Sequence, residues 1–181
     1  MISPSALKKC MYVLLLMIGF SSFEASAIDI NKPRHLRLYN TNTKEFLSSI
    51  YLSDGAYNTR EILRISVFLR DFRQNKAVLA DKKLLNALWV INEVTTNGRG
   101  IIKINSAYRT RETNKLLQRK GYKAADRSMH IRGKAIDFSI TGVSAKEIWQ
   151  VATKLKIGGV GYYPSSGFIH IDTGDIRYWR Y

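Results

Sequence analysis

The sequence is poor in cysteine, proline, histidine and acidic residues. Its single cysteine, Cys10, lies near the start of the chain, so the remainder has neither a disulfide framework nor a cysteine nucleophile. Three prolines, and no repeat or low-complexity tract, argue against a linker-rich or fibrous protein. With only three histidines, each can be weighed individually as a site residue.

The N-terminus has the order of features typical of a secretory signal peptide. Two lysines precede an apolar run over residues 11–20, and the small-residue sequence Ala25-Ser26-Ala27 follows. The run is too short to cross a bilayer comfortably as a helix. We therefore predict a signal peptide over residues 1–27 and a single domain over residues 28–181, exported to the periplasm or cell envelope without stable membrane insertion. The leader has no twin arginine, which favours general secretion.

The chain is strongly basic. Its formal charge is +15, and removal of Lys8, Lys9 and Glu24 with the leader lowers this by one to +14. Such a charge indicates an anionic partner, and for an exported protein the choices are cell-wall polymer, lipid headgroups or nucleic acid. Because no basic run exceeds two residues, a solvated surface that keeps the protein soluble explains the charge equally well.

Local patterns predict a mixture of helices and strands. Two strands flank a turn at residues 41–43, and Asn58 with Glu61 has the spacing of a capping box at a helix start. Asn97-Gly98 is a helix stop signal, and Ser144 with Glu147 is a second capping box. The predicted strands cover residues 35–40, 44–51 and 101–106. One predicted helix begins after Asn58, and three more cover residues 82–95, 111–120 and 144–156.

Two further strands carry the residues of chemical interest. Alternation over residues 134–140 turns Asp137 away from the apolar face, and alternation over residues 168–172 places His170 and Asp172 on one face. The turn composition of residues 164–167 predicts an antiparallel hairpin with residues 160–163. The predicted class is α+β, with a small antiparallel sheet and flanking helices.

His130, Asp137 and His170 form a candidate metal triad. A catalytic zinc needs about three nitrogen or carboxylate ligands and an open position, and two imidazoles with one carboxylate meet that need. Taken singly, each has an ordinary alternative: a surface histidine, an aspartate on the wet face of a strand, and a histidine in a hairpin. The spacing alone does not identify a metal site.

The local sequence is more specific. Residues 128–137 match the pattern Ser-x-His-x-x-Gly-x-Ala-x-Asp at every fixed position, and Ser106-Ala107-Tyr108-Arg109 precedes them. Downstream stand the blocks Gly-Gly-Val-Gly-Tyr-Tyr at residues 158–163 and His-Ile-Asp-Thr-Gly at residues 170–174. These segments resemble the M15 family of zinc D,D-peptidases, whose metal sites are similar to those of lysostaphin and hedgehog proteins. The downstream blocks are most similar to its branch of small exported murein endopeptidases.

The resemblance implies a function and a set of residue roles. One Zn2+ ion would be held by His130, Asp137 and His170, and a metal-activated water would hydrolyse cross-links between peptidoglycan peptide stems, including the diaminopimelate to diaminopimelate (3-3) link. Arg109 would stabilise the oxyanion or hold a substrate carboxylate, and Tyr108 would contact substrate. The expected partner is peptidoglycan rather than nucleic acid, and the expected state is a monomer.

One departure from the family bears on mechanism. Many M15 members carry a glutamate three residues before the last histidine, where this chain has Gly167. Asp172 is our substitute as general base, because it shares a strand face with His170. Two alternatives remain at this point: Asp172 orients His170, or it is an additional ligand.

Three other functions are compatible with the sequence. The chain could be a D-Ala-D-Ala carboxypeptidase of the same family, with the same metal chemistry on a different bond. It could be a non-catalytic peptidoglycan-binding module, which the missing glutamate would explain. A basic exported protein that binds nucleic acid or lipid, with incidental histidines, is the third.

Overall fold

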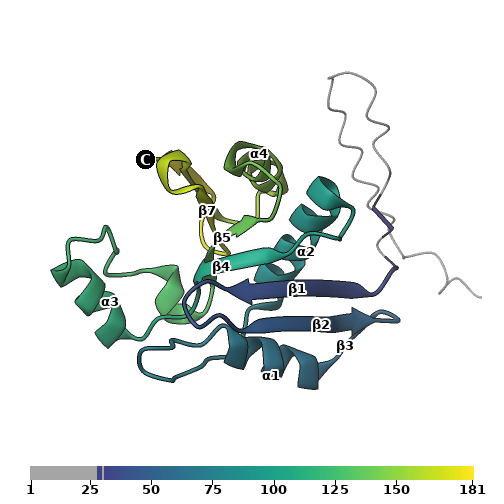
Figure 1. Ribbon diagram of the computed structural model, residues 1–181, viewed down its shortest axis with the longest axis horizontal. Coiled ribbons are helices and arrows are strands. Elements are labelled where there is room, and N and C mark those ends of the chain that lie inside the picture. The colour runs from purple at the N-terminus through teal and green to yellow at the C-terminus, as the bar shows by residue number, and fades with distance from the viewer. Residues whose placement is uncertain (1–27, 30) are drawn as a thin grey trace, which may run out of the picture.

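The computed structural model describes residues 28, 29 and 31–181 (Figure 1). The predicted signal peptide, residues 1–27, lies outside the described residues. Within them, no helix combines the length and the apolar character needed to cross a bilayer. In chain order the elements are β1 (Arg34–Asn40), β2 (Phe46–Ser53), β3 (Ala56–Tyr57), α1 (Thr59–Phe68), α2 (Lys82–Thr96), β4 (Ile102–Ser106), α3 (Arg111–Arg119), η2 (Met129–Arg132), β5 (Ala135–Ile140), α4 (Ala145–Leu155), β6 (Gly159–Tyr163), η3 (Pro164–Ser166), β7 (Phe168–Asp172) and β8 (Arg177–Arg180).

The helix boundaries are set by the capping residues that the sequence displays. The Asn58 side chain accepts a hydrogen bond from the Glu61 N–H at the start of α1. Ser144 and Glu147 form a reciprocal capping box at the start of α4. The C-terminal end of α2 is at Asn97, which adopts the left-handed conformation (φ 52°). The predicted helices are therefore confirmed to within a few residues.

A single eight-stranded sheet joins the two halves of the described chain, in the order β3-β2-β1-β4-β5-β7-β6-β8. The predicted α+β class is confirmed, but the sheet is larger than the small antiparallel one expected. Two of its seven pairings are parallel, β1 with β4 and β6 with β8. Both join strands that are separated in the chain by other elements, and local alternation carries no signal for such distant pairings.

The two faces of the sheet have different surroundings. One face packs against α2 and α4 and forms the core, with side chains such as Leu38, Ile104 and Phe138 fully or almost fully buried. Figure 1 shows α2 passing behind β4 and β1, with α4 above β5. The alternate residues of the same strands point to the opposite face. Asp137 and His170 belong to this second face.

Candidate metal centre

The first two site residues are brought together by strand register. Asp137 on β5 is the cross-strand partner of His170 on β7. Directly opposite residues on antiparallel strands have side chains in contact range, and Asp137 Oδ1 lies 2.8 Å from His170 Nδ1. The predicted alternation of both strands is confirmed, because neighbouring Phe138 and Ile169 point into the core.

The third residue, His130, comes from a short 3-10 turn rather than a strand. The Ser128 hydroxyl accepts a hydrogen bond from the His130 N–H at the start of η2, and Gly133 ends the turn with φ 64°. His130 Nδ1 lies 2.7 Å from the Ala107 carbonyl oxygen, so Nδ1 carries the proton and Nε2 turns towards Asp137. The fixed serine, histidine and glycine of the motif therefore shape one turn.

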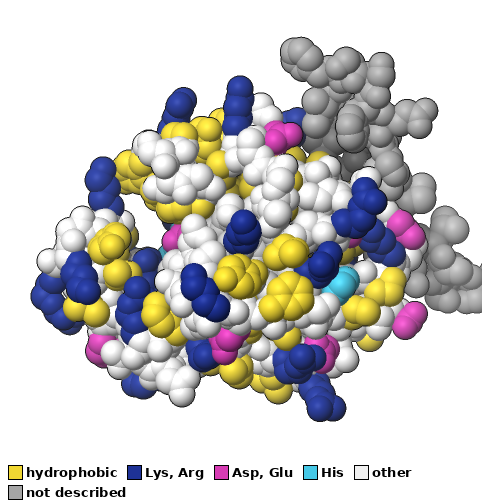
Figure 2. All heavy atoms as spheres, viewed as in Figure 1, with side chains coloured by type: hydrophobic (Ala, Val, Ile, Leu, Met, Phe, Trp, Pro, Cys, Tyr) yellow, Lys and Arg dark blue, Asp and Glu magenta, His cyan; other side chains and the backbone are white. Residues whose placement is uncertain are grey.

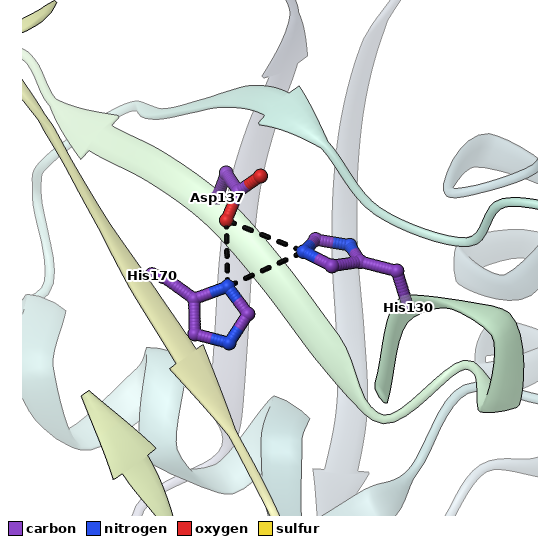
Figure 3. A group of neighbouring side chains, drawn as sticks. All are labelled: His130, Asp137 and His170. Carbon is purple, nitrogen blue, oxygen red and sulfur yellow. Dashed lines mark hydrogen bonds and ion pairs between the residues drawn. The ribbon is translucent and has the colours of Figure 1, made fainter. Parts of the chain in front are cut away.

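The three side chains converge on a common point, as Figure 3 shows. His130 Nε2 lies 3.3 Å from Asp137 Oδ1 and 3.3 Å from His170 Nδ1. Three ligands held at about 2.0–2.1 Å in tetrahedral geometry are about 3.3 Å apart. Two of the three separations match this value, and the third, between Asp137 Oδ1 and His170 Nδ1, is shorter at 2.8 Å. This is the only group of three such ligands found among the described residues. The arrangement could bind a metal.

The ionisation of Asp137 and His130 is suited to binding a cation. Burial by itself would raise the pKa of Asp137, but the adjacent imidazoles of His130 and His170 outweigh it and hold that pKa below its usual value. Burial lowers the pKa of His130, and a carboxylate and a neutral imidazole are the forms that coordinate a metal. Burial by itself would also lower the pKa of His170, but the carboxylates of Asp137 and Asp172 outweigh it and raise that pKa, so a metal ion must displace a proton from this ring.

Asp172 lies behind His170 and not beside the ligand atoms. Its Oδ2 is 2.9 Å from His170 Nε2, the ring nitrogen opposite the one that faces Asp137. The backbone N–H groups of Gly159 and Gly174 donate to Oδ1, and the Arg177 guanidinium donates to both oxygens. The carboxylate is fully buried, with partners on both oxygens.

The glycine-rich block before the hairpin provides room for these contacts. A Cβ on Gly159 would lie 2.6 Å from Asp172 Oδ2, and a Cβ on Gly161 would lie 2.5 Å from the Trp179 ring. Trp179 in turn packs against the His170 ring, with centroids 5.2 Å apart, and its Nε1 donates to the Tyr163 hydroxyl. The two glycines thus let β8 lie close over the histidine.

Arg109 reaches the centre from the segment between β4 and α3. Its backbone N–H donates to the His130 carbonyl, and its Nη2 donates to the Ser128 hydroxyl at 3.2 Å. Burial lowers the pKa of Arg109, and attraction to the Asp137 carboxylate partly offsets this effect. Among the described residues no carboxylate lies within ion-pair distance of the guanidinium, and its buried Nε has no partner. The side chain is a half-buried cation whose Nε donor is unused.

Asp71 was missed by sequence reasoning. It is almost fully buried, and its Oδ2 accepts hydrogen bonds from both the N–H and the hydroxyl of Thr110, next to Arg109. Nothing local distinguishes Asp71, which lies in the loop after α1. Its sequence neighbours include Arg70 and Arg73, which are typical of an exposed loop and give no sign of a buried carboxylate.

Two further positions singled out in the sequence are Gly167 and Tyr108. Gly167 has φ 69° at the end of the turn between β6 and β7, and beyond its chain neighbours a Cβ at this position would meet nothing within 4 Å. Tyr108 is half-buried, and its backbone N–H donates to the Leu69 carbonyl. No side-chain contact given by the structure joins Tyr108 to the metal ligands.

Comparison with known proteins identifies the family. The family model Peptidase_M15_2, described as "Peptidoglycan L,D-endopeptidase MepK", matches residues 28–179. The chain belongs to this M15 family. The peptidoglycan L,D-endopeptidase MepK of Escherichia coli strain K12 is 35% identical over 148 residues, 82% of this chain and 81% of that protein. The "Probable peptidoglycan L,D-endopeptidase MepK" of Haemophilus influenzae is 36% identical over 149 residues, 82% and 80% of the two chains.

No solved structure matches the chain. The M15 resemblance drawn from the motifs is confirmed, and the matched range contains His130, Asp137 and His170. The family is one of metal-dependent peptidases, which agrees with a ligand cluster of the observed composition.

Proposed function

We propose that this protein is a zinc-dependent endopeptidase that hydrolyses peptide cross-links in peptidoglycan, with the 3-3 link between diaminopimelate residues as its substrate. The convergence of His130 Nε2, Asp137 Oδ1 and His170 Nδ1 carries the proposal. Relatives named peptidoglycan L,D-endopeptidase support the substrate class and the bond type. The ion is a single Zn2+.

Arg109 is the second element of the proposed site. When bound, zinc supplies a Lewis acid that polarises a carbonyl and lowers the pKa of water. The Arg109 guanidinium, half-buried and without a carboxylate partner among the described residues, supplies fixed donors for a developing oxyanion or for a carboxylate of the stem peptide. Tyr108 is proposed to contact substrate, as the resemblance implies.

Tyr163 offers a further donor. Burial raises the pKa of its hydroxyl, which therefore stays protonated at neutral pH. Because the hydroxyl accepts a hydrogen bond from Trp179 Nε1, its own O–H remains available to donate. The Trp179 ring that donates this bond also packs against the His170 ring, which links Tyr163 to the same site.

For Asp172 the contacts favour an orienting role over the general-base role that the sequence suggested. The carboxylate accepts from His170 Nε2, so it holds the ring with Nδ1 towards Asp137. Its other contacts, with two backbone N–H groups and Arg177, leave it no path to a water beside the three ligand atoms except through the histidine ring. A carboxylate in this position acts through His170.

The proposed location is the periplasm or cell envelope, reached through the predicted leader, and the proposed state is a monomer. Figure 2 shows the surface hollowed between the α3 region and the C-terminal strands, close to where β5 and β7 lie in Figure 1. Such a hollow gives a polymeric substrate access to the site.

The decisive experiment is incubation of the protein without its leader with whole peptidoglycan, with and without chelator, followed by mass spectrometry of the released muropeptides. We expect cross-linked dimers to become monomers, the reaction to stop with chelator, and zinc to restore it. His130→Ala is the inactive control. Loss of terminal D-alanine alone would show a carboxypeptidase, and unchanged muropeptides from a folded, zinc-loaded protein would show a wall-binding module.

A further inference from the structure

The sheet face that carries the metal centre continues beyond it over four strands. Ser139 follows Asp137 on this face of β5 and pairs with Lys103 on β4. Lys103 pairs with Tyr39 on β1, and Tyr39 pairs with Phe46 on β2. Since paired residues on neighbouring strands point to the same side of a sheet, a single row of side chains extends from the metal centre to the far strand.

This row is part of a surface that the helices leave uncovered, because α2 and α4 pack on the other face. Phe46 is 53% exposed and Ile50 is 49% exposed, unusually open for large apolar side chains on strands. Figure 2 shows hydrophobic and basic side chains together over β1 and β2. We call this surface the open face and define it by His35, Arg37, Tyr39, Phe46, Ile50 and Lys103.

Several side chains of the open face are held in place. His35 Nε2 lies 2.7 Å from the Ser48 hydroxyl, joining β1 to β2. Arg37 donates to the Arg99 carbonyl oxygen at 3.1 Å. A surface whose polar side chains are already ordered loses less conformational entropy when a ligand binds.

The charge of the open face indicates which kind of ligand it can bind. Among the outward-facing residues of β1, β2, β4 and β5, Asp137 is the only acid, whereas Arg37 and Lys103 are cations with no carboxylate of the described residues within ion-pair distance. Apolar rings beside cations suit a polymer that combines apolar surfaces with carboxylates. Peptidoglycan, with sugar rings and acidic peptide stems, has this chemistry.

We propose that the open face binds the peptidoglycan strand next to the cross-link that is cut, so that binding extends well beyond the scissile bond. The identity of the polymer rests on the proposed function. Phe46 lies three strand spacings, about 14 Å, from Ser139, and Asp137 is two residues further along β5, so the two are about 16 Å apart, which an extended peptide spans in about five residues. A whole strand reaches both places, whereas a small soluble fragment bound at the metal centre need not touch Phe46.

The test is a comparison of matched double variants on two substrates. Tyr39→Ser with Phe46→Ser removes the rings of the open face. Val94→Ser with Tyr178→Ser removes exposed apolar side chains, 36% and 47%, from α2 and from the side of β8 that contacts α4. Arg37→Gln with Lys103→Gln removes two positive charges from the open face. The matched control, Lys146→Gln with Lys154→Gln, removes two positive charges from α4. Binding is measured by co-sedimentation with insoluble peptidoglycan in chelator, and turnover on a soluble cross-linked muropeptide dimer.

We expect each open-face variant to lose roughly tenfold in affinity for insoluble peptidoglycan, while its control stays within about twofold of wild type. All four should cleave the soluble dimer at a rate within about twofold of wild type. Wild-type binding by folded open-face variants, or equal losses in the controls, would overturn the proposal. Co-sedimentation needs no turnover, so failure of the endopeptidase assay would refute the proposed function and leave the binding result valid.

Discussion

The metal centre is assembled from two regions that are held in place differently. Asp137 and His170 lie on β5 and β7, where backbone pairing on neighbouring strands fixes both side chains. Arg109 and His130 lie outside the strands, in the connection 107–134 between β4 and β5, and depend on individual hydrogen bonds. Strand positions are therefore fixed by the sheet and can be predicted from alternation, whereas this connection depends on a few polar contacts, each of which a single substitution can remove.

The segment 107–134 has its own set of anchors. Near its start, Thr110 donates two hydrogen bonds to the Asp71 carboxylate. Near its end, His130 Nδ1 donates to the carbonyl oxygen of Ala107. Between them, the Arg109 N–H donates to the His130 carbonyl. These bonds tie the guanidinium and the imidazole to each other, so a disturbance at one anchor should affect both.

The largest expected effect is the loss of a metal ligand, which should have the same result in either region. His130→Ala in the segment, and Asp137→Ala or His170→Ala on the strands, each remove one of three ligands and should abolish zinc binding and lower turnover by a thousandfold or more, as an order of magnitude. Zinc content by mass spectrometry and cleavage of muropeptides measure this. His35→Ala on the open face is the histidine control and should keep its zinc. Retention of zinc by any of the three ligand variants would refute the ligand set.

The next effect separates metal binding from catalysis within the connection 107–134. Arg109→Ala should keep zinc but lower kcat/KM by about 10²–10³, because a buried donor to the oxyanion or substrate carboxylate is lost. The exposed neighbour Arg111→Ala is the control and should retain near-normal activity. Equal effects of the two substitutions would show that Arg109 contributes only to the general charge.

A smaller effect tests whether Asp172 acts through His170 on the strand side. Asp172→Asn should weaken zinc affinity by roughly 10–100-fold, because the carboxylate no longer holds the imidazole. Competition with a zinc chelator measures this affinity. Unchanged zinc affinity together with lost turnover would instead support Asp172 as the general base. Arg177→Gln, which removes only one partner of the carboxylate, should have a weaker effect in the same direction.

The smallest expected effect concerns the anchor at Asp71. Burial by itself would raise the pKa of this carboxyl, but the surrounding threonine hydroxyl and N–H donors outweigh burial and lower it. Because the folded-state pKa is below the unfolded value of about 3.9, the carboxylate stabilises the fold above that pH, and this contribution is lost as pH falls through the folded-state value. Asp71→Asn should therefore lower the free energy of unfolding by about 1–3 kcal/mol at pH 7.

Thermal unfolding as a function of pH measures this contribution. The difference in stability between wild type and Asp71→Asn should narrow below about pH 4, where the wild-type carboxyl begins to protonate. Turnover should fall several-fold with zinc retained, because Arg109 is less well positioned. A pH-independent difference in stability would show that the side chain acts by packing alone.

Much of the fold was predictable because its signals are local. The cap at Asn58 and the capping box at Ser144 involve residues three positions apart, and the first hairpin pairs two strands that follow each other directly in the chain; all are present. The size of the sheet and its two parallel pairings were not predictable, since they join strands separated by other elements. Asp71 was missed for the same reason, because its partner Thr110 is 39 positions away.

The sequence by itself predicted the three residues of the candidate ligand set and determined on which strand faces Asp137 and His170 lie, because alternation and the family motif are both properties of short segments. Tertiary structure decided how His130 reaches them and which nitrogen of His170 faces Asp137. It also decided that the site face continues to Phe46. These outcomes depend on register and packing between segments far apart in the chain, and no local pattern encodes them.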